Sequence, residues 1–253
     1  MKLACWNVNS VRARQDRLLA WLEKNRPDVL CLQELKVIDE DFPRDAIEGL
    51  GYHAAVHGQK TYNGVAILSR TKPKNVTRGL TDDPAARLIA ADFGKIHVLS
   101  AYVPNGQEVG SDKWDYKLRW MKNLRELLDE RYSPDDRVAL CGDFNVARDD
   151  LDVARPDDWA GSVLCHGDVR RAMQSWLDWG LVDVFRERHP EGKVYSWWDY
   201  RMLAFPKNLG LRLDYVLATK PLAKKCTAAE IDRAERKGEK PSDHAPVVVE
   251  FDE

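Results

Sequence analysis

The sequence predicts an α/β protein, and three observations lead to this class. Short apolar runs rich in Val, Ile and Leu recur along the chain between polar clusters, as buried strands do. Segments with apolar residues at helical spacing lie between several of these runs. The 253 residues are 44% hydrophobic and 32% charged, the balance of a globular domain with a large core, and no low-complexity linker divides them. We therefore expect one domain over residues 1–253.

Eight strands are predicted from the apolar runs, each bounded by polar residues. They cover residues 2–6, 29–32, 65–68, 88–92, 96–103, 137–141, 213–218 and 246–251.

Three helices are predicted between the strands. In 13–25, Leu18, Trp21 and Leu22 recur at helical spacing, and Pro27 follows as a stop. The same spacing predicts a helix over 115–131, and a third over 169–179 is closed by Gly180. The stretches between these elements that are richest in loop residues are 103–113, 148–167 and 199–211.

The cysteines and the N-terminus predict a reduced, cytoplasmic protein. The five cysteines are far apart and show no C-x-x-C spacing, so we expect buried free thiols rather than disulfides or a zinc site. The N-terminus has only a short apolar stretch, unlike a signal peptide, and no run approaches the roughly 18 apolar residues of a membrane span.

Charge is distributed unevenly although the formal net charge is only −2. Residues 141–160 contain six acidic and two basic side chains, whereas residues 201–240 contain ten basic and five acidic ones. An acidic pocket beside a basic flank would suit a divalent cation that faces a phosphate backbone. Ordinary solvated surface charge would give the same composition.

Polar residues stand at the ends of several predicted strands, where α/β proteins often hold functional side chains. A single carboxylate there is usually a cap or a solvated turn, but this sequence repeats the placement many times. The residues are Asn7, Glu34, Asp143, Asn145, Asp214, Asp243 and His244.

These residue types fit the hydrolysis of a phosphodiester. That reaction needs a cation to neutralise the phosphate oxygens, a base for the attacking water and a hydrogen-bond donor to the developing charge. The oxygen atoms of Glu34, Asp243 and Asn7 suit Mg²⁺ or Mn²⁺ better than zinc.

The remaining polar residues are candidates for proton transfer. Asp143 is a candidate base, and Asn145 would hold the same water or phosphate. His244 is a candidate donor to the phosphate, with Asp214 fixing its tautomer. A lone carboxylate inside an apolar strand is costly, so Asp214 needs a partner, and His244 is the best candidate.

Eight motifs in order along residues 6–247 resemble the exonuclease III / apurinic endonuclease family of the endonuclease–exonuclease–phosphatase superfamily. They are WNVNSVRAR (6–14), QELK (33–36), YNGVAILSR (62–70), YVPNG (102–106), GDFNVA (142–147), SWWDYR (196–201), GLRLDYVLA (210–218) and SDHAPV (242–247). QE, GDFN and SDH occur across the superfamily, whereas the full set with LRLDY and SWWDYR is specific to this family.

The resemblance implies a four-layer α/β sandwich, with two mixed β-sheets face to face, helices outside and the active site at one end. It implies a Mg²⁺-dependent enzyme, in which Mn²⁺ substitutes. Asn7, Glu34 and Asp243 would surround the metal, with Glu34 the surest ligand, and Asp143 would be the base. The Asp214–His244 pair and the Tyr102 hydroxyl would contact the phosphate or the leaving group, with Asn145 beside Asp143.

The implied substrate is double-stranded DNA, cut 5′ to abasic sites or trimmed at 3′ ends by a repair enzyme. A monomer is the default expectation, because the sequence carries no signal of oligomeric state. Trp197 would line the pocket for the abasic sugar, with Leu211 opposite. The other candidate DNA contacts are Lys36, Tyr62, Asn105 and Arg201.

Two alternatives stay open from the sequence. One is a phosphodiesterase of the same fold that acts on a small molecule or a lipid headgroup, and the other is a non-catalytic interaction module. The chain also departs from the family pattern after GSVLC, where residues 166–170 (HGDVR) replace a Ser-rich turn and a Glu-Arg pair. Loop 106–113 is rich in acid and poor in arginine. The first departure puts the substrate preference in doubt, and the second would weaken the grip on the strand opposite the cut.

Overall fold

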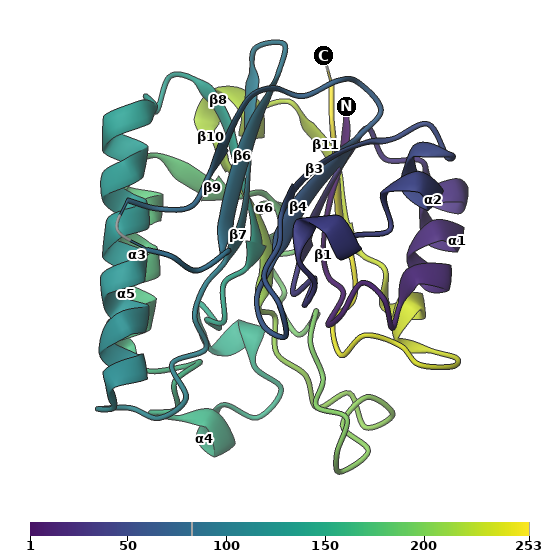
Figure 1. Cartoon of the computed structure of the whole chain (residues 1–253). Coiled ribbons are helices and arrows are strands. Elements are labelled where there is room, and N and C mark those ends of the chain that lie inside the picture. The colour runs from purple at the N-terminus through teal and green to yellow at the C-terminus, as the bar shows by residue number, and fades with distance from the viewer. Residues whose placement is uncertain (82, 253) are drawn as a thin grey trace.

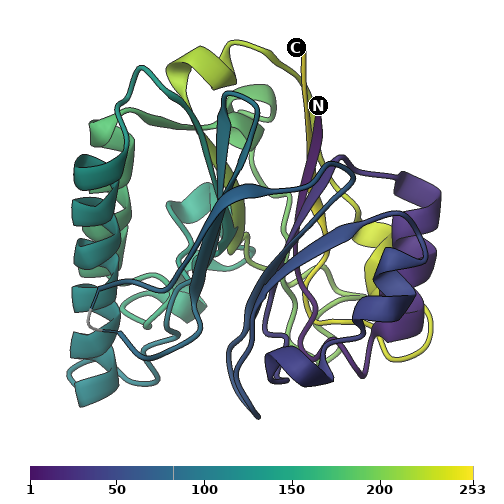
Figure 2. The same cartoon turned by 45° about the horizontal axis from the view of Figure 1, so that its top comes forward.

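The computed structural model describes residues 1–81 and 83–252 and consists of four layers. Two β-sheets pack face to face in the middle (Figure 1). Helices α3 (Asp112–Arg131) and α5 (Gly167–Trp179) cover one sheet, and α1 (Gln15–Asn25) and α2 (Arg44–Glu48) cover the other. The turned view keeps the two helical layers on opposite sides (Figure 2). The predicted four-layer sandwich is confirmed.

The first sheet has six strands and is mixed. Its spatial order is β11 (Cys226–Ile231), β12 (Val247–Phe251), β1 (Lys2–Asn7), β2 (Val29–Gln33), β4 (Val65–Ser69) and β3 (His53–His57). The central neighbours β1 and β2 are parallel, and the other pairs are antiparallel.

The second sheet repeats this plan. Its spatial order is β5 (Lys74–Arg78), β6 (Leu88–Phe93), β7 (Ile96–Tyr102), β8 (Arg137–Asp143), β10 (Asp214–Thr219) and β9 (Leu181–Asp183). Again only the central pair, β7 and β8, is parallel. Each sheet therefore has one parallel pair whose carboxyl ends point the same way.

Apolar side chains form a core between the sheets and one under each helical layer. The core between the sheets contains small residues, including Cys5, Cys31 and Cys141. All five cysteines are free, and four of them are buried, as predicted, while Cys226 is half-buried.

All eight predicted strands and all three predicted helices are confirmed, with ends that differ by at most three residues. The largest difference is in α3, which begins at Asp112 because Ser111 accepts a hydrogen bond from the N–H of Trp114 and caps the helix. The short helices α2, α4 (Pro156–Trp159), α6 (Val184–Arg188) and α7 (Lys220–Ala223) were not predicted. Nor were strands β3, β5, β9 and β11.

The long loops gather at one end of the molecule, opposite the two termini (Figure 1). This end contains the carboxyl ends of β1, β2, β7 and β8, together with α4. Among the described helices, none is both long and apolar enough to cross a bilayer.

Candidate active site

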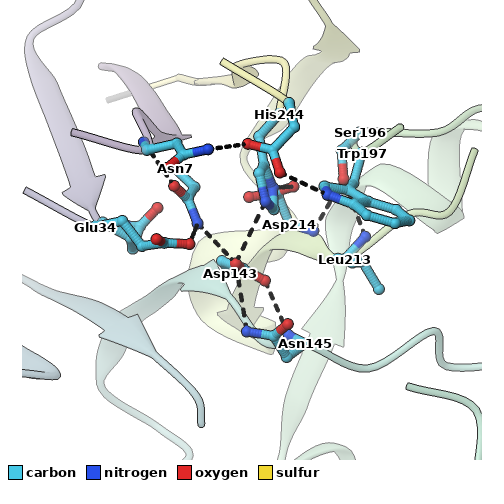
Figure 3. Close-up of polar contacts among 12 residues, drawn as sticks. Asn7, Glu34, Asp143, Asn145, Ser196, Trp197, Leu213, Asp214 and His244 are labelled. Carbon is cyan, nitrogen blue, oxygen red and sulfur yellow. Dashed lines mark hydrogen bonds and ion pairs between the residues drawn. The ribbon is translucent and has the colours of Figure 1, made fainter. Parts of the chain in front are cut away.

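The polar residues predicted from the strand ends meet at the loop-bearing end of the sandwich (Figure 3). Asn7 ends β1 and Asp143 ends β8, while Asp214 begins β10. Glu34 follows β2 directly, and His244 precedes β12. The two sheets therefore contribute to one group of side chains.

The backbone around this group is unusual. Glu34, Lys36 and Asn145 all have positive φ angles, of 53°, 58° and 49°. Such conformations are uncommon for residues other than glycine and often mark functional sites. Before Asp143, a Cβ atom on Gly142 would lie 1.9 Å from the carbonyl oxygen of Ala101, so only glycine fits where β8 lies against β7.

Asn7 joins the acidic residues of the two sheets. Its side-chain nitrogen donates to Glu34 Oε1 at 2.9 Å and to Asp143 Oδ2 at 2.8 Å. Its side-chain oxygen accepts the N–H of Asn9 at 2.9 Å, which defines the orientation of the amide. We predicted this oxygen as a metal ligand, but the structure turns it away from the carboxylates. Asn7 instead holds the two carboxylates together.

Asp143 is buried and is surrounded by hydrogen-bond donors. Besides Asn7, the backbone N–H of Asn145 donates to Asp143 Oδ1 at 2.9 Å. The side chain of Asn145 donates to the carbonyl of Val103 and accepts from the side chain of Asn105 at 3.1 Å. Asn145 therefore links Asp143 to the loop after β7, close to where it was predicted to act.

Asp214 and His244 form the predicted pair. The Nδ1 atom of His244 donates to Asp214 Oδ2 at 2.8 Å, and its Nε2 atom lies 3.6 Å from Asp143 Oδ2. Both residues are buried, and the Oγ atom of Ser196 accepts the backbone N–H of Asp214. The imidazole therefore lies between two carboxylates.

These positions shift the pKa values of both titrating groups. Burial alone would lower the pKa of His244, but the charges of Asp214, Asp143 and Asp243 outweigh it and raise the pKa to about 10. Burial raises the pKa of Asp143 to about 7; the nearby His244 opposes this rise, and Asp214 and Glu34 add to it. At neutral pH His244 is therefore a cationic donor, and Asp143 is a carboxylate that readily takes up a proton.

Glu34, Asp143 and His244 offer ligand atoms that all lie within 4.8 Å of one another. The protonated His244 is a poor ligand, so the two carboxylates are the hard oxygen donors of the group. A divalent cation fits this position, because it would offset both the burial of the Asp143 carboxylate and the repulsion from Asp214 and Glu34, which together raise the pKa of Asp143.

Asp243, the third predicted ligand, lies at the edge of this group. One carboxylate oxygen accepts from the side chain of Asn9 at 2.9 Å and the other from Trp197 Nε1 at 3.0 Å. Burial opposes its ionisation, but His244 and these two donors lower the pKa of Asp243 below its usual value. Asp243 is therefore a firmly ionised carboxylate, and its role as a ligand stays a prediction.

Lys36 and Asn9 connect Glu34, on one side of the group, to Asp243 on the other. The ammonium group of Lys36 lies 2.8 Å from Glu34 Oε2 and also donates to the side chain of Asn9. Asn9 in turn contacts Asp243. Asn9 was missed in the sequence, although it stands two residues after Asn7 in the WNVNS motif.

Tyr102 opens onto a groove of about 630 Å³ that begins at Glu34. Burial raises the pKa of Tyr102 well above 10, and the charges of Glu34 and Asp143 raise it further, so the phenol stays protonated at neutral pH. Arg87, which the sequence analysis missed, stacks over the Tyr102 ring at 4.8 Å. The predicted DNA contacts Lys36, Tyr62 and Asn105 also line this groove.

Trp197 and Leu211 do not form the predicted pair of facing walls. Leu211 is fully buried in an apolar cluster with Val153 and Leu164, and residues 153 and 197 also bridge to its backbone. Trp197 is half-buried and packs edge-to-face against Trp159 at 5.9 Å. The accessible pocket beside Trp197 is lined by Trp159, while Leu211 lies in the apolar cluster against which Trp197 packs, and its contact with DNA stays a prediction.

Arg201 lines the same pocket and is largely exposed. Both carboxylate oxygens of Asp199 accept from its guanidinium group, at 3.0 and 2.7 Å. These bonds use Nε and Nη2, so Nη1 can still donate to a phosphate, and Arg201 stays a predicted contact.

The acidic stretch 141–160 is not one pocket. Only Asp143 belongs to the group described above, whereas Asp152 is buried and accepts from Arg212. Arg212 is also fully buried and donates to Asp183, so part of the predicted basic flank lies inside the protein. The composition predicted charged patches on the surface, but Asp152, Asp183 and Arg212 form an ion network inside the protein.

Comparisons with known proteins agree with this geometry. Residues 4–244 match the model of the endonuclease/exonuclease/phosphatase family. Exodeoxyribonuclease III of Haemophilus influenzae is 38% identical, and the match covers 99% of this chain and all of that protein.

Two solved structures are similar over the full length of both chains. An AP endonuclease from Archaeoglobus fulgidus superposes with a TM-score of 0.97 at 42% identity. A 3′ phosphatase from Neisseria, bound to a product DNA hairpin, has a TM-score of 0.96 and also 42% identity. The chain therefore belongs to the endonuclease/exonuclease/phosphatase family and groups within it with the exodeoxyribonuclease III and AP endonuclease proteins.

Proposed function

We propose that this protein is a Mg²⁺-dependent DNA phosphodiesterase of base-excision repair. It would incise the strand 5′ to abasic sites and remove nucleotides or blocking groups from 3′ ends. The observation that carries the proposal is a chain of polar contacts. Hydrogen bonds join Glu34, Asn7 and Asp143, and Asp143 lies 3.6 Å from the imidazole of the hydrogen-bonded His244–Asp214 pair. The relatives are repair nucleases, and one was solved with DNA, which favours DNA over a small headgroup as substrate.

Asp143 would take a proton from the attacking water. Its carboxylate is held on both oxygens by Asn7 and Asn145, so the free lone pairs point in defined directions. Burial raises its pKa, which favours proton uptake, and a cation beside Glu34 would moderate this rise. A bound Mg²⁺ beside Glu34 and Asp143 would supply charge neutralisation at the phosphate oxygens.

His244 and Tyr102 would stabilise the charge that develops on the phosphate. The imidazolium donates its Nδ1–H to Asp214, and its Nε2–H would donate to a phosphate oxygen. Tyr102 stays protonated and therefore donates to the phosphate or the leaving oxygen rather than acting as a base. Asn105, exposed beside Asn145, would contact the phosphate.

One gel assay tests the function. A duplex with a single abasic analogue and a duplex with an intact recessed 3′ end are incubated with enzyme in Mg²⁺, in chelator, and in chelator followed by excess Mg²⁺ or Mn²⁺. We expect cleavage that chelator abolishes and either metal restores. Cleavage in chelator would refute the metal requirement. Failure to cut either duplex in Mg²⁺ would refute the function.

A further inference from the structure

A buried lysine lies beneath the catalytic group. Lys117, in the first half of α3, is fully buried. Its ammonium nitrogen donates to the backbone carbonyls of Asn105 at 3.0 Å, Asn145 at 2.7 Å and Val163 at 2.7 Å. In its ammonium form the lysine has three protons, so these three bonds use all of them, while burial lowers the pKa of Lys117 to about 7. Burying a charge without such partners would be strongly unfavourable.

The three carbonyls belong to three different loops. Asn105 lies in the loop after β7, Asn145 in the loop after β8, and Val163 in the loop before α5. The first two loops meet above the lysine, where the side chain of Asn105 donates to that of Asn145. The backbone of Asn145 then holds Asp143. One ammonium group thus joins the segments on either side of the proposed base.

The surroundings keep the lysine in this position. A Cβ atom on Gly106 would lie 2.9 Å from Lys117 Cδ and 3.4 Å from a ring carbon of Trp114. Gly106 also has a φ of +92°, which favours glycine. The glycine of the YVPNG motif therefore leaves room for the lysine stem, and the loop closes over it.

We propose that Lys117 is a positioning residue that sets the Asn105–Asn145 pair, and through it the orientation of Asp143, from below. The inference rests on the proposed function of this site. Lys117 does not touch the substrate position described above, so its loss should change turnover far more than substrate binding. A displacement of catalytic groups by about 1 Å can cost on the order of 10²-fold in rate.

The test compares Lys117→Met with Lys117→Arg and a matched control. Methionine keeps an unbranched apolar stem but removes all three donors, whereas arginine keeps charge and donors. Lys122→Met makes the same change on the exposed face of the same helix, where Lys122 pairs with Glu126. In Mg²⁺, we expect Lys117→Met to lower kcat about 10²-fold with KM within about threefold. We expect Lys117→Arg to recover at least part of the loss, and Lys122→Met to match wild type.

Backbone hydrogen exchange gives a second readout that needs no activity. In Lys117→Met, residues 103–107, 144–147 and 161–165 should exchange faster while the strands of both sheets keep their protection. Unchanged exchange in the three loops would overturn the proposal. It would also be overturned if Lys117→Met lowered the stability of the whole protein together with kcat and Lys117→Arg restored neither. If Lys117→Met does not fold, Lys117→Gln replaces it, with the same loops expected to loosen. If wild-type enzyme cuts neither duplex, the proposed function fails, and the exchange result still decides whether Lys117 holds the loops.

Discussion

Replacing Asp214 by Asn should move the alkaline limit of activity toward neutral pH. In the wild-type protein the pKa of His244 is raised from 6.5 to about 10, which corresponds to about 5 kcal/mol of preference for the imidazolium form. The charge of Asp214, whose Oδ2 accepts from the ring at 2.8 Å, is the largest favourable contribution. An opposite charge at this range commonly shifts a pKa by about 1–3 units, and burial would continue to disfavour the cation. We therefore expect the pKa of His244 to fall to between about 7 and 9.

The assay is the pH dependence of kcat/KM on the abasic duplex between pH 6 and 10.5. Wild type should keep its rate until the pH nears 10, whereas Asp214→Asn should lose rate from about pH 7–9 upward. Asp129→Asn is the control, because Asp129 pairs with Arg125 on the outer face of α3 and its loss should leave the profile unchanged. Two profiles with the same alkaline limit would refute this account of the pair.

The same pair links stability to pH with a definite sign. A folded-state pKa above the unfolded value contributes stability that is fully present below pH 6.5 and is lost as the pH rises through about 10. The difference in free energy of unfolding between wild type and Asp214→Asn, measured by urea titration, should therefore shrink across that range. A difference that stays constant from pH 6 to 10 would contradict the protonation state assigned to His244.

Four further substitutions test other parts of the site. Glu34→Ala should abolish cleavage at millimolar Mg²⁺ and raise the metal requirement in a Mg²⁺ titration; a wild-type rate would exclude Glu34 as a ligand. Asp143→Asn should lower single-turnover rates by ~10²–10⁴ while DNA affinity stays within a few-fold, and equal losses of both would indicate a structural role. Trp197→Ala should lower the ratio of abasic incision to 3′-end removal, and a ratio equal to wild type would exclude Trp197 from the pocket. Arg212→Met should destabilise the fold by ~3–5 kcal/mol in urea titration, because two buried aspartates each lose a guanidinium partner, and an unchanged midpoint would show that the ion network is dispensable.

The strands that the sequence did not predict are the four edge strands of the two sheets. β3, β5, β9 and β11 each have a neighbour on one side only. β5, for example, reads KNVTR and is mostly exposed. Central strands are apolar on both faces and produce continuous apolar runs, whereas an edge strand needs polar residues to avoid pairing with other chains. Apolar runs in the sequence therefore revealed only the inner strands.

The sequence predicted which residues form the candidate site better than it predicted the hydrogen bonds between them. Strand ends and motifs located Glu34, Asp143 and His244, because residue type and position carry that information. The orientation of the Asn7 amide depends on a backbone N–H of the next turn, which no residue type reveals. Lys117 was missed for a related reason. A lysine at one helical position reads as solvated surface, and its burial depends on three carbonyls distant in sequence.

The junction between the two sheets has a mechanical consequence. Asn7 ends a strand of one sheet and Asp143 ends a strand of the other, and a 2.8 Å hydrogen bond joins them. The spacing of the sheets is set by small residues such as Ala139 and Cys141, which β8 contributes to the core they share. A larger side chain there would wedge the layers apart or shear them, and the catalytic carboxylates would separate without any change in their own loops. The packing of small side chains between the two sheets thus sets the distance between the catalytic residues at the end of the sandwich.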